Sequence, residues 1–127
     1  MKKAYIFSML FWGLFASCKN DGYHKIGPEE ARQMMKETAD FILLDVRTES
    51  EYRETRIPDS RLIPDYEIGA RAHSELPDKN AVILVYCRSG RRSAGAARKL
   101  AKMGYTQIYD FGGIMNWPYE TVKSREE

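Results

Sequence analysis

The sequence predicts an α/β domain in three layers, with a central parallel sheet of five strands and helices on both of its faces. Two observations indicate this class. The apolar runs at 41–44 and 81–86 are continuous and do not alternate with polar residues, which is typical of strands buried on both faces. Helical patterns stand between the strand patterns, and such alternation indicates a parallel sheet. A chain of 127 residues is long enough for one core of this kind.

Five segments have the composition of short, buried strands. They are expected at 24–26, 41–44, 61–64, 81–86 and 107–109. In sheets of this class ligands bind at the carboxyl ends of the strands, so the residues that follow the strands are the first candidates for a site. Asp45 and Cys87 both occupy such positions.

The helix boundaries are marked by proline, glycine and a threonine. Gly27 and Pro28 suit the start of the first helix, and Thr48 is expected to cap the second. Pro77 closes the third helix, and Gly104 ends the fourth. The helices are expected at 28–38, 49–54, 66–76, 93–103 and 114–117.

The most informative segment is the loop Cys87-Arg88-Ser89-Gly90-Arg91-Arg92, which joins a buried strand to a helix. At such a junction, backbone N–H groups and the positive end of the helix dipole point into the loop. This setting and the cationic neighbours both favour the thiolate form of a cysteine. Cys87 is therefore expected to be a nucleophile that handles a small anion.

Charge is distributed unevenly along the chain. No acidic residue occurs from Lys79 to Tyr109, a stretch that contains the three loop arginines, so the local field should attract anions. Once Lys2 and Lys3 are set aside, the 18 acidic residues are matched by an equal number of basic ones. A domain without net charge offers no broad basic surface, and we expect no nucleic-acid partner.

Residues 1–17 are expected to be a signal peptide outside the fold. Lys2 and Lys3 precede an uncharged apolar stretch that is shorter than the roughly 20 residues a membrane-spanning helix needs. The segment that ends at Cys18 resembles a bacterial lipoprotein signal, in which the cysteine is lipidated and becomes the new N-terminus. An ordinary cleaved signal and an uncleaved anchor are the alternatives. We expect a domain exported to the cell envelope, periplasmic or tethered to the membrane through the lipid alone, with residues 18–23 as the tether.

The number and spacing of the cysteines exclude several kinds of chemistry. Cys18 and Cys87 are the two cysteines of the chain, so lipidation of the first would leave Cys87 as an unpaired and reactive thiol. No CxxC motif is present, so dithiol exchange is not expected. His24 and His73 lie far apart and give no recognisable metal site with one thiol. We expect no metal and no other cofactor.

Three groups of residues, taken together, carry a family resemblance. They are Leu44-Asp45-Val46-Arg47 with Glu51-Tyr52 and 57–64, then Tyr86 to Ser93, then Gly104-Tyr105, Ile108-Tyr109 and Gly112-Gly113-Ile114 with Trp117. In order and spacing they resemble the single-domain rhodanese family over residues 24–120, and 121–127 is expected to be a frayed, charged tail. Thr55-Arg56 and Asp59-Ser60 depart from the Gly-His and Gly-Ala usual in the family.

This resemblance implies sulfur transfer in two half-reactions. The Cys87 thiolate attacks the outer sulfur of a donor such as thiosulfate, sulfite leaves, and a persulfide remains on the enzyme. An acceptor, either cyanide or a thiol that can belong to a protein, then removes that sulfur. No histidine base is needed when the thiolate is already populated. We expect a monomer whose partners are a small anionic sulfur donor and a thiol or protein acceptor.

The loop residues receive separate roles by the same resemblance. Arg92 and then Arg88 are the preferred ligands for the donor anion, and at least one of the three arginines, Arg91 included, is expected to form only a structural ion pair. Ser89 and Gly90 shape the loop and can contact the substrate. Ser93 lies at the substrate-binding end of the loop and is expected to cap the helix.

Residues outside the loop receive structural roles. Asp45 and Arg47 are expected to form an ion pair near the site, with Glu51 as a possible partner, and to take no part in acid–base chemistry. Phe111 and Trp117 are expected in the core or in a pocket wall.

Two other classes of function are considered. The first is a cysteine-dependent phosphatase or arsenate reductase. Such phosphatases use Cys-x5-Arg, whereas here the sixth residue after Cys87 is Ser93 and the last arginine is the fifth. The second is a lipid-anchored binding module or persulfide carrier without turnover. The presence of Cys87 in the loop weighs against a module that only binds.

Overall fold

The computed structural model describes residues 21–124. The strands form one sheet in the order β1-β5-β4-β2-β3, and every neighbouring pair is parallel. The strands are β1 His24–Lys25, β2 Phe41–Asp45, β3 Arg61–Leu62, β4 Val82–Cys87 and β5 Gln107–Gly113. The predicted signal peptide and the lipidation residue Cys18 lie outside the described residues.

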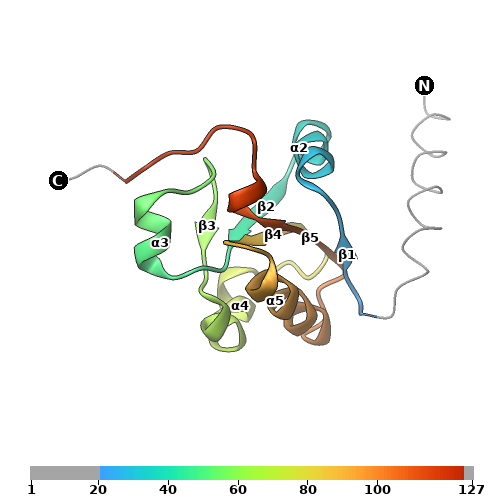
Figure 1. Ribbon diagram of the computed structural model, residues 1–127. Helices are drawn as coiled ribbons and strands as arrows, with labels where there is room; N and C mark the ends of the chain where they lie inside the picture. Colours follow the sequence, from blue (N-terminus) through green and yellow to red (C-terminus); the bar gives the residue numbers. More distant parts are fainter. Residues whose placement is uncertain (1–20, 125–127) are drawn as a thin grey trace, which may run out of the picture.

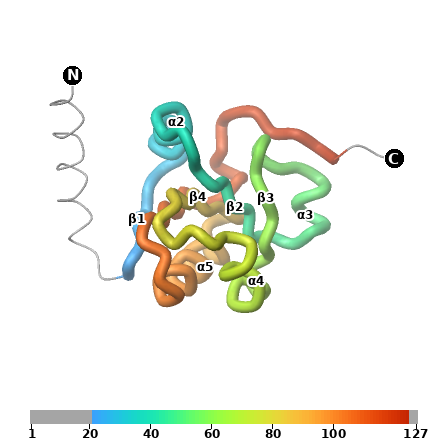
Figure 2. Tube along the Cα trace, turned by 180° about the vertical axis from the view of Figure 1, so that it is seen from behind, coloured from blue at the N-terminus to red at the C-terminus, as the bar shows by residue number. Residues whose placement is uncertain are grey.

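Helices lie on both faces of this sheet, as the sequence predicts. The elements are α2 Pro28–Glu37, α3 Glu49–Glu54, η1 Asp65–Glu67, α4 Ile68–Glu75, α5 Arg91–Lys102 and η2 Ile114–Asn116. Figures 1 and 2 show α2 on one side of the sheet and α4 and α5 on the other. The three-layer α/β architecture is therefore confirmed. In residues 21–124 no helix has both the length and the apolar composition needed to cross a membrane.

Each face of the sheet has its own apolar core. Leu44, Ile83 and Val85 point toward α4 and α5 and pack with residues such as Leu100. Side chains that alternate with these, such as Leu84, face α2 and join Ala31, Met34, Met35, Phe111 and Trp117. The buried places predicted for Phe111 and Trp117 are confirmed.

Several predicted boundaries differ from the structure. The predicted helix 66–76 divides into a 3-10 turn, η1, and the shorter α4, because Glu67 at the junction departs from helical backbone angles. The last strand does not end at Tyr109 but continues to Gly113, because it pairs with β4 as far as Cys87. The short helix expected at 114–117 is the 3-10 turn η2.

The two ends of the described chain are more fixed than the sequence predicts. Tyr23, placed by sequence in the tether, is buried in the core on the α4 and α5 side. Val122, placed in the frayed tail, pairs with Arg56 through two backbone hydrogen bonds of 2.8 and 2.9 Å. The hydroxyl of Ser124 accepts a hydrogen bond of 2.7 Å from Nη1 of Arg56. The tail is therefore docked at least as far as Ser124.

Candidate active site

The candidate nucleophile lies at the centre of the sheet edge. Cys87 is the last residue of β4, which has β5 on one side and β2 on the other. Its thiol is free and fully buried. Asp45 ends the neighbouring strand β2, so both residues chosen by their position after a strand do reach the same edge. This edge is where ligands bind in parallel α/β sheets.

A backbone N–H group in the loop after Cys87 donates a hydrogen bond to the sulfur. The N–H of Gly90 points at Sγ of Cys87, with 3.0 Å between nitrogen and sulfur. Gly90 has φ +112°, a conformation that side chains rarely adopt, and it is the N-cap residue of α5. The helix therefore begins at Arg91, and the sulfur lies at its positive end. The prediction that Ser93 caps this helix is wrong, because Ser93 already lies in the first turn.

The end of β5 and the residues directly after it pack closely against the backbone of this loop. A Cβ atom on Gly113 would lie 2.0 Å from the carbonyl oxygen of Arg88, so only glycine fits there. Two residues further on, the N–H of Met115 donates to that same carbonyl at 3.2 Å. The ladder between β4 and β5 shifts register between Val85 and Cys87, directly before the loop. Irregular pairing of this kind is often found next to active sites.

Ser93 and Asp110 form a buried polar pair beside the sulfur. Oγ of Ser93 lies 3.5 Å from Sγ of Cys87 and donates to Oδ1 of Asp110 at 2.7 Å. Oδ1 also accepts the N–H of Gly112 at 3.0 Å. All three side chains, those of Cys87, Ser93 and Asp110, are fully buried. The structure thus gives Ser93 a contact with the thiol in place of the helix cap.

The three arginines of the loop differ in their surroundings. Arg88 and Arg91 are exposed, and neither side chain is paired with another residue in the range 21–124. Arg92 forms two hydrogen bonds with Glu51, of 2.9 and 3.0 Å. These bonds are the main cause that raises the pKa of Arg92, and the nearby Cys87 adds to it. Arg92 is therefore the loop arginine with an ion pair, and Arg88 and Arg91 keep free guanidinium groups.

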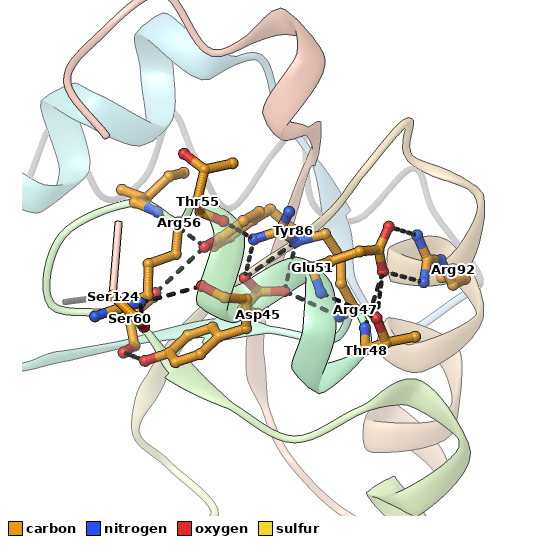
Figure 3. A network of polar contacts seen from close by, with 12 residues as sticks. Asp45, Arg47, Thr48, Glu51, Thr55, Arg56, Ser60, Tyr86, Arg92 and Ser124 are labelled. Carbon is orange, nitrogen blue, oxygen red and sulfur yellow. Dashed lines mark hydrogen bonds and ion pairs between the residues drawn. The ribbon is translucent and has the colours of Figure 1, made fainter. Parts of the chain in front are cut away.

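Glu51 connects the first turn of α3 to the loop (Figure 3). Its carboxylate accepts the N–H of Thr48, while the Thr48 hydroxyl accepts the N–H of Glu51, and this reciprocal cap confirms the predicted start of the helix. The hydrogen bonds from Arg92 lower the pKa of Glu51 from 4.5 to about 2. Sequence reasoning offered Glu51 as a partner of Arg47, whereas its strongest contacts are with Arg92.

The predicted ion pair between Asp45 and Arg47 is present and buried. Nε and Nη2 of Arg47 donate to the Asp45 carboxylate at distances of 2.7 to 3.1 Å, and Nη2 also donates to the carbonyl of Thr55. Burial alone would lower the pKa of Arg47, but the bonds to Asp45 raise it. Figure 3 shows that the pair ties the end of β2 to the segment after α3. This geometry supports a structural role for Asp45 and Arg47.

Sequence reasoning missed Asp110 altogether. Its signal was available, because an aspartate near the carboxyl end of a parallel strand faces the same edge as Asp45 and Cys87. The predicted strand ends at Tyr109, one residue before Asp110, so Asp110 was not among the residues expected at this edge. His24, for which the sequence predicts no metal site, is half-buried and stacks on the Tyr109 ring with 4.7 Å between the ring centres. Within residues 21–124 no three His, Cys, Asp or Glu side chains are grouped to hold a metal.

The fold and the site together define an α/β domain with one buried thiol at a strand end, held at a helix N-terminus among arginines. The sequence model of the rhodanese-like domain matches residues 27–119, and the chain belongs to this family. Membership of the family supports sulfur transfer as the general chemistry of the domain.

Similar proteins include two bacterial sulfurtransferases and one solved structure. A sulfurtransferase of Allochromatium vinosum is 37% identical over 95 residues, which cover 74% of this chain and 87% of the relative. The thiosulfate sulfurtransferase PspE of Escherichia coli is 35% identical, over 63% of this chain and 77% of the relative. The structure described as a rhodanese with anions from E. coli has a TM-score of 0.62 and 33% identity, covering 66% of this chain and 99% of its own.

Proposed function

We propose that this domain is a thiosulfate-type sulfurtransferase that carries the transferred sulfur as a persulfide on Cys87. The observation that carries the proposal is the position of the sulfur. It accepts the N–H of Gly90 at the first turn of α5. Two arginines that have no ion-pair partner among residues 21–124, Arg88 and Arg91, lie in the loop and at the start of the helix. A sulfur that develops negative charge is stabilised by such a donor and by the helix dipole.

The first half-reaction uses Cys87 as a thiolate. Its sulfur attacks the outer sulfur of thiosulfate, a new S–S bond forms, and the S–S bond of the donor breaks. The electron pair of that broken bond leaves with sulfite, so no outside oxidant or reductant is needed. In the second half-reaction an acceptor thiolate or cyanide attacks the outer sulfur, and Cys87 departs as a thiolate.

Arg88 and Arg91 are the proposed ligands of the donor anion. The sequence alone favoured Arg92, but its guanidinium already holds the Glu51 carboxylate. An arginine without an ion pair can offer its fork of N–H donors to a sulfonate oxygen, whereas a paired one would first have to break two charged hydrogen bonds. A similar protein was solved with anions present, which agrees with an anion site in this family.

The burial of Cys87 adds a condition on substrate entry. Its side chain has no exposed surface, so a donor reaches Sγ only after part of the loop has moved. Arg88 and Ser89 are the exposed residues between Cys87 and Gly90, so they are the part of the loop that a donor in solution meets first. Binding of the anion by Arg88 would couple donor capture to this opening.

The test is mass spectrometry of the peptide that contains Cys87 after exposure to thiosulfate. We expect the addition of one sulfur atom to Cys87, its removal by cyanide, and no addition in Cys87→Ala. A p-nitrophenyl phosphate assay in parallel tests the phosphatase alternative. Phosphate release that depends on Cys87, without persulfide formation, would replace the proposal with that alternative. A persulfide that forms and passes to no small acceptor would support the carrier role.

We also propose that the domain works in the cell envelope, anchored through a lipid on Cys18. This proposal depends on the sequence of the first 18 residues alone. Metabolic labelling with a fatty acid in a bacterial host should label the wild-type chain and leave Cys18→Ala unlabelled. A chain that stays in the cytoplasmic fraction without label would contradict it.

A further inference from the structure

The two most exposed large apolar side chains of residues 21–124 lie in turns at the edge of the sheet that holds the thiol. Tyr66 is 68% exposed and Met115 is 63% exposed. Tyr66 belongs to η1, which follows β3, and Met115 belongs to η2, which follows β5. Because all the strands are parallel, both turns lie at the carboxyl edge, where Cys87 ends β4.

Backbone contacts hold these two turns on either side of the thiol loop. The N–H of Met115 donates to the carbonyl of Arg88 at 3.2 Å, so η2 borders the loop directly. The N–H of Asp65, the first residue of η1, donates to the carbonyl of Val46 at 2.9 Å, just beyond the end of β2. The turn η1 also packs against α5. Since β5 and β2 are the two neighbours of β4, the loop lies between the two turns.

Positive charge without a partner lies on the exposed surface of the loop. Arg88 and Arg91 are exposed, and neither has an ion pair within residues 21–124. The nearby carboxylates of Glu51 and Glu67 are each held by another arginine. Asp65, on the η1 side, has a carboxylate without an ion pair in the same range. The surface beside η2 is therefore the positive part of this edge.

We propose that Tyr66, Met115, Arg88 and Arg91 form a docking surface for the sulfur acceptor, and that this acceptor is a protein with its cysteine in an acidic segment that also carries apolar residues. Aromatic residues, methionine and arginine are the residue types enriched at the centres of protein interfaces. An acidic segment complements the two arginines, which are free again once sulfite has left. The proposal rests on the proposed function, because it names the acceptor of the Cys87 persulfide.

The chemistry of the site requires a thiol or a similar nucleophile at this surface. The acceptor thiolate attacks the outer sulfur of the Cys87 persulfide, a new S–S bond forms on the acceptor, and the S–S bond to Cys87 breaks. The electron pair of that bond leaves with Cys87 as a thiolate, so no oxidant or reductant is needed. Cyanide is too small to contact apolar side chains on both sides of the loop, whereas a polypeptide segment can contact both.

The test starts from protein that already carries one sulfur on Cys87, so binding of the donor does not enter the measured rates. The acceptors are cyanide and three short peptides with one cysteine each. The first peptide has leucines next to the cysteine and glutamates outside them. Lysines replace the glutamates in the second peptide, and serines replace the leucines in the third. Each single-turnover rate is divided by the rate of the same peptide with a small disulfide, which removes differences in thiol reactivity.

We expect the first peptide to accept sulfur about tenfold faster than either of the others after this correction. Tyr66→Ser and Met115→Ser should each slow transfer to the first peptide about five- to tenfold and leave the rate with cyanide unchanged. Tyr66→Phe and Met115→Leu retain the apolar surface and should follow the wild-type protein. Val122→Ser is the matched control, because Val122 is also exposed but pairs with Arg56 after α3.

Three results would overturn the inference. The first is equal corrected rates for the three peptides. The second is a loss in the serine variants that is absent, or that is equal for peptide and cyanide, since an equal loss indicates a disturbed loop. The third is self-association, or binding to vesicles of phosphatidylglycerol and phosphatidylcholine, that both serine variants abolish. It would assign the surface to a second copy of the chain or to a membrane.

Failure of the proposed function is a separate result. If the wild-type protein takes up no sulfur from thiosulfate, the proposed function fails, and the docking surface is tested by binding alone. The first and second peptides, with serine in place of cysteine, are then titrated while the methyl signal of Met115 is followed by NMR. A shift with the glutamate peptide and none with the lysine peptide would support a surface for an acidic partner. No shift with either peptide would refute it.

Discussion

Arg92 and Glu51 lie 41 positions apart in the sequence and are joined by two hydrogen bonds of 2.9 and 3.0 Å. Through this pair the first turn of α5 is fixed to the first turn of α3. Because α5 begins directly after the thiol loop, the position of that loop depends on a carboxylate from a separate helix (Figure 3). The pair therefore contributes to site geometry as well as to stability.

Glu51→Gln should change the acid stability of the domain. The pKa of Glu51 is about 2 in the folded protein and 4.5 as its ordinary value, so its stabilising effect is complete above about pH 4.5 and is lost as pH falls toward 2. We expect Glu51→Gln to lower the free energy of unfolding near pH 7 by about 1 kcal/mol, since the pair is partly exposed. The difference from wild type should vanish near pH 2. Urea unfolding at several pH values measures this. A constant difference at all pH values would contradict the assignment.

Arg88→Ala and Arg91→Ala should each weaken donor binding. Each change removes one charged contact with the anion, and we expect KM for thiosulfate to rise about tenfold. The rate at saturating donor should change less. Arg98→Ala, an exposed arginine further along α5, is the matched control and should leave KM unchanged. Steady-state kinetics with cyanide as acceptor measures both constants. An equal KM in all three variants would exclude the two loop arginines as donor ligands.

Gly113→Ala should disrupt the thiol loop. The added Cβ would lie 2.0 Å from the Arg88 carbonyl oxygen and 2.6 Å from Cα of Ser89, so the backbone of the loop must move. We expect a loss of about 1–3 kcal/mol in the free energy of unfolding, as for other overpacked sites, together with loss of persulfide formation. Gly95→Ala in α5 is the control, because its Cβ would meet no atom within 4 Å. Thermal unfolding of both variants should show the control at least as stable as wild type.

Arg47→Met should be more damaging than removal of the whole ion pair. It leaves the Asp45 carboxylate buried without its cation, which costs about 3–5 kcal/mol. In the double variant Asp45→Asn with Arg47→Met no uncompensated charge remains, and the loss should be smaller. Denaturant unfolding of the two variants gives the comparison. A double variant as unstable as the single one would indicate that Arg47 acts mainly through its bond to the Thr55 carbonyl.

Elements of the fold could be predicted from the sequence wherever the residues that define them are neighbours in the chain. The capping box of Thr48 and Glu51, the proline that starts α2 and the apolar runs of β2 and β4 each depend on neighbours in the chain. The same holds for Cys87, since the end of a buried strand, a glycine and a helix start follow one another there. The extent of β5 was underestimated because its last residues are defined by pairing with β4, which local composition does not record.

The sequence by itself determined that one thiol stands at a strand end and a helix start among arginines, because these are properties of a single continuous segment. Tertiary structure decided which arginine is paired, and it placed Asp110 behind Ser93. These contacts join residues from separate strands and helices, and sheet order and register bring them together. A side chain's partners are set by the neighbours that folding provides, and short-range sequence patterns do not contain that information.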